Sequence, residues 1–180
     1  MTPQRTLLVV AAAIVALAAA GLLFAVDSTE VPERPDRDPL NPAKIPVLPD
    51  NLDTFEHVNT LVVPDPDSPI HGIHHFYANH RAAAALEAGG SDEYPTEAIF
   101  VGKVFKPVKT DEGWYTEGDL VAYTLMEKDP VDVAARVTGG WHFVMYDAEG
   151  ASKGVDPVEA CFGCHEPSPE TDFVLSTALE

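Results

Sequence analysis

The sequence predicts a small α+β domain, built mainly on one antiparallel β-sheet with short helices, behind an apolar N-terminal helix. An unbroken apolar run covers residues 7–26 and accounts for the N-terminal helix. Between residues 54 and 180, short apolar and aromatic runs alternate with turns that contain Gly and Pro, which is typical of strands. The helical segments in this part are too short for a four-helix bundle.

Residues 1–26 are predicted to be a signal peptide or a membrane anchor. Arg5 precedes the apolar run and an acidic segment follows it, which orients the rest of the chain away from the cytoplasm. A cleaved signal peptide has a shorter apolar region and a small-residue cleavage site such as Ala18-Ala19-Ala20. An anchor needs about 20 apolar residues, which this run supplies. The length favours an anchor, and both interpretations place the globular part in the periplasm.

Residues 27–53 are predicted to be a Pro-rich linker, and residues 54–180 form the globular domain. Six prolines fall within residues 32–49, and such a segment favours an extended tether. The formal net charge of −18 argues against nucleic acid as a partner. The acidic surface either keeps the exported domain soluble, which is sufficient to explain it, or steers it toward a basic redox partner protein.

The first half of the domain predicts a strand, a capped helix and a hairpin. Residues 73–79 favour a strand, after which Asn79 can cap a short helix over residues 81–88 that ends at two glycines. Residues 98–105 and 120–127 favour two further strands. The polar segment between them predicts a loop, so the two strands are expected to form a long hairpin.

The second half predicts two more helices and two short strands. Asp129-Pro130 favours a short helix with Pro at its first position, and residues 141–146 favour a strand. The run Asp156-Pro157-Val158-Glu159 predicts a helix start, with Asp as the cap, Pro at the first position and Glu at the third. Residues 173–175 favour a short closing strand.

The last predicted helix carries the most specific motif of the chain, Cys161-Phe162-Gly163-Cys164-His165. This C-x-x-C-H pattern is the attachment signature of c-type haem, in which two thiols bind the porphyrin covalently. His165 is then the expected proximal ligand of the iron. The chain contains two cysteines in total, so one covalently attached haem c would use both of them.

Two other sites could use the same cysteines. A zinc site would need two further ligands, such as His71 and His75 or His75 and His80, far upstream in the sequence. A thioredoxin-like redox pair would need a strand–helix setting early in a βαβ unit, whereas this pair lies near the C-terminus. The haem interpretation is therefore preferred.

A C-x-x-C-H motif late in a β-rich domain resembles the cytochrome P-460 family, which includes the cytochromes c′-beta. Typical small cytochromes c carry the motif early and a methionine ligand downstream, and here no methionine follows Met145. The resemblance extends from His71 to the C-terminus. Besides the haem motif it rests on the following short segments: 71–74, 77–79, 94–95, 126–129, 140–143 and 171–174.

This resemblance implies one haem with His165 on one side and an open distal side. It implies binding of small nitrogen-oxide ligands such as nitric oxide, or oxidation of hydroxylamine, and it suggests a homodimer. Members that oxidise hydroxylamine carry a lysine cross-linked to the haem. Aligned by the turn at Pro95, that position falls on Gly102, with Lys103 next to it. Adjacent side chains of a strand face opposite ways, so we expect Lys103 to face away from the haem unless a bulge intervenes.

Candidate haem contacts come from the aromatic residues of the predicted strands. Phe76 and Phe100 are candidate distal caps, with packing in the core as the alternative for each. Trp141 is expected to pack against the haem or the core. Met126 or Met145 could instead ligate the iron and give a six-coordinate electron-transfer cytochrome. Whether the protein is an oxidoreductase stays open at this point.

Overall fold

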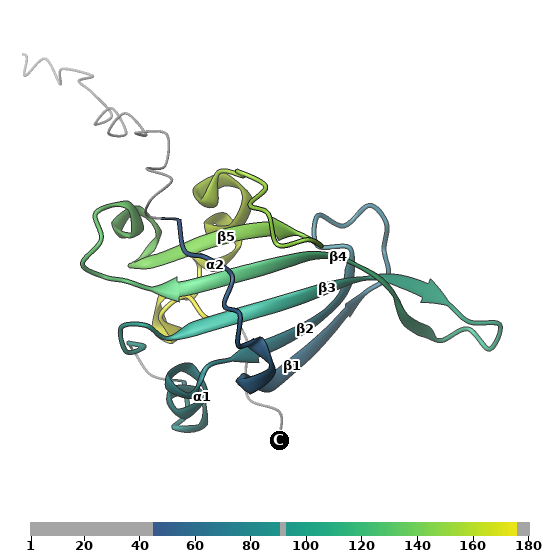
Figure 1. The fold of residues 1–180 in the computed structure, drawn as a ribbon, viewed down its shortest axis with the longest axis horizontal. Helices are drawn as coiled ribbons and strands as arrows, with labels where there is room; N and C mark the ends of the chain where they lie inside the picture. The colour runs from purple at the N-terminus through teal and green to yellow at the C-terminus, as the bar shows by residue number, and fades with distance from the viewer. Residues whose placement is uncertain (1–44, 91–92, 176–180) are drawn as a thin grey trace, which may run out of the picture. The chain divides into compact units, whose positions relative to one another are not determined.

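The computed structural model describes residues 45–90 and 93–175 (Figure 1). The predicted signal peptide or anchor and the linker up to residue 44 lie outside these residues. Within the described ranges, no helix has the length and apolar character needed to cross a membrane.

A five-stranded antiparallel sheet forms the centre of the domain, with the strands side by side in chain order, β1-β2-β3-β4-β5 (Figure 1). This arrangement confirms the predicted α+β class with one antiparallel sheet. The strands are β1 (Glu56–Val63), β2 (Gly72–Ala78), β3 (Ile99–Lys109), β4 (Tyr115–Lys128) and β5 (Trp141–Asp147).

The hairpin of β3 and β4 is longer than predicted. The segment predicted as a polar loop belongs mostly to the two strands, and the turn itself covers residues 110–114. Pro107 is accommodated because the register shifts on either side of Phe105, and such irregularities are where a strand tolerates proline. Strand β1 was not predicted, because it is an edge strand whose side chains are mostly exposed and lack a clear apolar pattern.

The first predicted helix is confirmed and the later elements need correction. Helix α1 (His80–Glu87) begins after Asn79, whose side chain accepts a hydrogen bond from the Ala82 backbone at 3.0 Å. The helix predicted at Asp129-Pro130 is instead a turn, followed by the 3₁₀-helix η2 (Ala134–Thr138). The predicted closing strand at residues 173–175 is absent, and Phe173 has a left-handed φ of 65°, outside the region of regular strands.

One face of the sheet packs against residues 158–175 and is called here the C-terminal face. Phe76, Phe100 and Phe143 lie on it, since the register aligns them across β2, β3 and β5. Three short elements cross this face: the π-helix η3 (Val158–Phe162), the helical turn α2 (Gly163–His165) and the 3₁₀-helix η4 (Pro169–Thr171).

The opposite face packs against residues 45–55 and is called the N-terminal face. Val101, Leu125 and Val144 form its centre, and the chain segment before β1 covers them (Figure 1). The apolar side chains of that segment are Ile45, Leu48, Leu52 and Phe55. The sheet is therefore buried on both faces.

Part of the segment predicted as a linker lies against this N-terminal face. The Tyr146 hydroxyl donates a hydrogen bond to the Pro46 carbonyl. Burial, with a smaller contribution from Glu127, raises the pKa of Tyr146 to about 12, which keeps this phenol protonated as a donor. Residues 45–53 thus contribute packing to the globular unit.

The centre of the N-terminal face gives a test of this packing. Leu125 is 2% exposed, so Leu125→Ala removes buried apolar atoms and should lower the free energy of unfolding by about 2–5 kcal/mol. Val121 on the same strand is 45% exposed, so Val121→Ala should cost less than about 1 kcal/mol. Denaturant unfolding of the two variants checks this, and equal losses would contradict the assigned packing.

Candidate cofactor site

The C-x-x-C-H motif lies on a short helical segment that is capped at its N-terminus by a side chain. The Asp156 carboxylate accepts hydrogen bonds from the backbone nitrogens of Val158 and Glu159, at 2.9 and 3.3 Å. Pro157 occupies the first helical position, as the sequence predicts. The segment places Cys161 partly buried and Cys164 exposed, and neither forms a disulfide. Burial raises the pKa of Cys161, and the neighbouring Cys164 adds a smaller contribution in the same direction, so the Cys161 thiol stays protonated.

His165 at the end of this segment is held by one hydrogen bond. Its Nδ1 lies 2.7 Å from the Phe173 carbonyl oxygen. A carbonyl only accepts, so Nδ1 carries the proton and the lone pair is on Nε2. Burial lowers the pKa of His165, although the carbonyl contact acts in the opposite direction. The imidazole is therefore neutral and prepared to bind a metal through Nε2.

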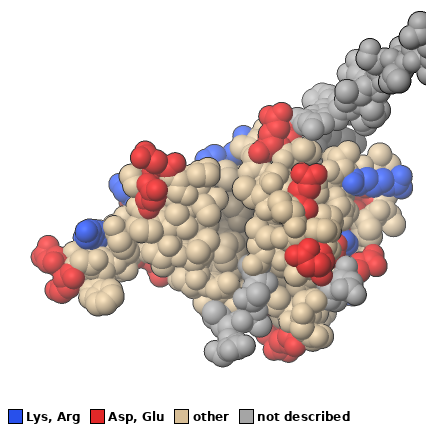
Figure 2. Space-filling model, turned by 180° about the vertical axis from the view of Figure 1, so that it is seen from behind, with Lys and Arg blue, Asp and Glu red and all other residues tan. Residues whose placement is uncertain are grey.

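Aromatic side chains of the sheet and the C-terminal segment surround this histidine. The Phe143 ring lies 4.9 Å from the His165 ring and 6.1 Å from Phe162, between ring centroids. Phe162 in turn contacts Phe173 at 5.2 Å. The view from behind Figure 1 shows this side of the molecule as mainly uncharged, with separate carboxylates scattered over it (Figure 2).

The three sheet residues predicted to contact a cofactor all lie on the C-terminal face, at different depths. Phe76 is half-buried and stacks on His74 at 5.9 Å. Phe100 is buried and meets Tyr94 edge to face at 5.4 Å. Trp141 is fully buried and donates from Nε1 to the Asp172 carbonyl at 2.8 Å. Phe76 is thus the most accessible of the three.

This donor set fits a covalently attached haem. Two thiols stand three residues apart, the adjacent imidazole has Nε2 available, and an apolar aromatic surface lies beside them. The zinc alternative lacks support. Within the described residues, the one set of three or more metal-ligand side chains that converges is Asp129, Asp132 and His142, which includes neither cysteine.

Two of the three histidines considered as zinc partners are engaged elsewhere. His71 Nδ1 contacts the Asp65 carbonyl at 2.9 Å, within its own loop. His75 Nε2 pairs with Glu117 at 2.9 Å, across the sheet from the cysteines' face. These contacts further disfavour a shared site with Cys161 and Cys164.

Lys103 faces away from the C-terminal face, as the alternation of strand residues predicts. Its ammonium lies 4.8 Å above the ring of Tyr77, and β3 pairs with β2 without a bulge at this point. Gly102 faces the cysteines' side instead. A Cβ at Gly102 would lie 2.4 Å from Thr124 Oγ1 and 3.3 Å from Phe76, so these side chains already fill the space.

A buried ion pair that was not predicted from the sequence lies next to the site. Lys128 Nζ lies 2.7 Å from Asp172 Oδ1, and the two residues are 3% and 5% exposed. The burial of Lys128 was predictable, because Lys128 follows Thr124 and Met126 at every second position of β4 and so lies on the same face. Asp172 lies in a turn, where no sequence pattern marks it as buried.

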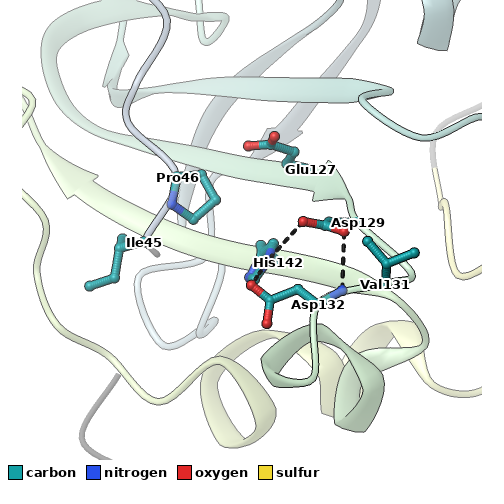
Figure 3. A pocket seen from close by; sticks show the side chains of 7 residues that line it. All are labelled: Ile45, Pro46, Glu127, Asp129, Val131, Asp132 and His142. Atoms are coloured by element: carbon teal, nitrogen blue, oxygen red, sulfur yellow. Dashed lines mark hydrogen bonds and ion pairs between the residues drawn. The ribbon is translucent and has the colours of Figure 1, made fainter. Parts of the chain in front are cut away.

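A cluster of titratable side chains lies on the N-terminal face, away from the cysteines. His142 Nε2 lies 3.5 Å from Asp132 and 4.0 Å from Asp129, at the wall of a pocket of about 480 Å³ (Figure 3). Glu127 lines the same pocket. Burial raises the pKa of Glu127; His142 opposes this shift, and Asp129 and Glu97 add to it.

Comparison with known proteins gives one family. The sequence model for cytochrome P-460 matches residues 49–176, a span that includes all five strands and the C-x-x-C-H motif. A search of curated proteins gives no match.

The raised pKa of Glu127 predicts a pH-dependent stability. The folded protein binds this proton more tightly than the unfolded chain, so the free energy of unfolding falls as the pH rises from 4.5 through the folded pKa. Glu127→Gln should therefore be more stable than the wild type at pH 7 and equal to it well below pH 4.5. Glu112→Gln in the exposed hairpin turn serves as the control and should change little. Denaturant unfolding against pH measures this, and a loss of stability at pH 7 in Glu127→Gln would contradict it.

Proposed function

Since the chain belongs to the cytochrome P-460 family and is a haem cytochrome, we propose that it binds small nitrogen-oxide ligands at one covalently attached haem c with an open distal side. The haem would be held by thioether bonds from Cys161 and Cys164, with His165 as the proximal ligand. When bound, such a haem supplies an iron that can take a diatomic ligand or change its charge by one electron.

One observation carries this proposal above all. His165 is fixed by the Phe173 carbonyl, so Nε2 is its available nitrogen, and the two thiols lie on the same helical segment. Neutral imidazole is a common iron ligand, and its orientation by a backbone acceptor raises its basicity. The segment lies over an aromatic surface of the sheet, which favours an apolar group.

The side chains of the sheet would determine access to the distal side. Phe76 is half-buried and next to Gly102, so it is the better candidate for a distal cap, while Phe100 and Trp141 pack deeper in the core. An aromatic cap excludes water and offers no hydrogen bond, which favours uncharged diatomic ligands over anions.

The position of Lys103 argues against the hydroxylamine-oxidising activity that a lysine–haem cross-link would support. Its side chain lies over Tyr77 on the N-terminal face. Lys128 does lie on the C-terminal face, but its ammonium pairs with Asp172. Ligand binding without a cross-link is therefore the better supported function.

The proposal includes the setting of the domain. A c-type haem is attached after export, which agrees with the apolar run at residues 7–26, and we place the domain in the periplasm, anchored through that run. A homodimer and a redox partner protein are consistent with this role, while the charge of −18 disfavours nucleic acid.

The ferrous spectrum with and without carbon monoxide tests the proposed ligation. The full chain, made in a host that matures c-type cytochromes, should retain its pigment after denaturation and show a high-spin ferrous form that carbon monoxide converts. Cys161→Ser with Cys164→Ser should lose the covalent pigment.

A low-spin ferrous spectrum that carbon monoxide leaves unchanged would contradict an open distal side. Met126 packs against the aromatic cluster of the C-terminal face, so it is the candidate sixth ligand in that case. Met126→Leu and the matched Met145→Leu would then identify the ligand by which of them restores carbon monoxide binding.

Lys103 provides a separate prediction. Lys103→Met should leave the Soret bands of both oxidation states unchanged, because the side chain lies on the opposite face from His165. The electronic spectra of wild type and variant, recorded side by side, measure this. A red-shifted ferrous Soret band in the wild type that Lys103→Met abolishes would establish the cross-link and the oxidising activity.

A further inference from the structure

The hydrogen-bond acceptor of His165 belongs to an unusual turn. Asp172 and Phe173 have φ angles of 49° and 65°, in the left-handed region that residues other than Gly rarely adopt. Two such residues in succession persist only where the surroundings determine them. Other contacts must therefore hold this turn. The turn in its place directs the Phe173 carbonyl toward His165 Nδ1.

The polar contacts of Asp172 hold it from three directions. Its Oδ1 accepts from Lys128 Nζ at 2.7 Å, at the end of β4. Its Oδ2 accepts from the Tyr94 backbone nitrogen at 2.8 Å, in the loop before β3. Its carbonyl accepts from Trp141 Nε1 at 2.8 Å, at the start of β5. All four residues are at most 5% exposed, so water does not replace these bonds.

The Lys128 side chain is itself fixed. Its ammonium donates to the Gly139 carbonyl at 3.2 Å and lies 5.2 Å above the Trp141 ring. The Phe173 ring closes the arrangement, because a Cβ at Gly139 would lie 2.2 Å from it. The turn is thus anchored through its carboxylate, its backbone and its aromatic ring.

We propose that Asp172, paired with Lys128, is a positioning residue for His165: the buried ion pair fixes the Phe173 carbonyl and thereby the orientation and donor strength of the proximal imidazole. This inference rests on the proposed function, since it concerns the nitrogen that would bind iron. A strong Nδ1–H···O bond increases the basicity of Nε2 and favours the ferric state. Weakening the anchor should raise the reduction potential and weaken the iron–histidine bond.

Three variants separate the effect of the buried charges from the effect of the position of the turn. Asp172→Asn keeps the size of the side chain and tolerates a left-handed φ, but it removes the charge that binds Lys128. The double change Asp172→Asn with Lys128→Met also removes the lysine, so the net buried charge stays zero. Trp141→Phe keeps an aromatic ring beneath Lys128 and removes the Nε1 donor to the Asp172 carbonyl.

The test uses the holoprotein with its haem attached. In each variant the ferrous-to-ferric equilibrium should shift toward ferrous, by about tenfold in the double variant, or about 59 mV for one electron. The iron–histidine stretching frequency of the ferrous form, read by resonance Raman spectroscopy, should decrease. Asp132→Asn alters a carboxylate on the N-terminal face and should change neither quantity, whatever it does to stability.

The outcomes separate a failure of the positioning role of Asp172 from a failure of the proposed function. If the wild type carries covalent haem but the double variant and Trp141→Phe keep the wild-type potential and stretching frequency, the positioning role is wrong and the proposed function stands. If Asp172→Asn does not fold, the double variant and Trp141→Phe give the same measurement. Wild-type protein without covalent haem would instead refute the proposed function.

Discussion

The hydrogen bond from His165 Nδ1 to the Phe173 carbonyl is the contact on which the site depends. It selects the imidazole tautomer, and so it leaves Nε2 as the nitrogen for a metal. It also closes the C-terminal segment into a loop, since His165 ends α2 and Phe173 lies after η4. That loop covers the aromatic face of the sheet, so one contact links His165 to the core.

Strand alternation is the second constraint, because it places neighbouring residues of a strand on opposite faces of the sheet. On β3, Gly102 faces the cysteines and Lys103 faces Tyr77, so a single step along the strand decides whether a lysine can reach the site. The same rule puts Glu127 in the acidic pocket and Lys128 against Asp172.

Strong local patterns made the sheet, the capped helix α1 and the cofactor motif predictable from the sequence. Asn79 caps α1 through its own side chain, and the C-x-x-C-H spacing needs no tertiary information. The predictions failed where tertiary contacts decide the backbone. Residues 173–175 look like a strand, but the anchored turn at Asp172 prevents one. The role of Lys128 was missed because its partner lies 44 residues away in the sequence, and β1 was missed because an edge strand lacks a buried pattern.

The covalent attachment of haem at Cys161 and Cys164 can be tested most directly by mass spectrometry of the peptide that contains both cysteines. The protein should be made in a host that matures c-type cytochromes and treated with an alkylating agent after denaturation. This peptide should carry the mass of one haem, and neither thiol should be alkylated. A haem-free peptide with both thiols alkylated would show that Cys161 and Cys164 do not bind haem.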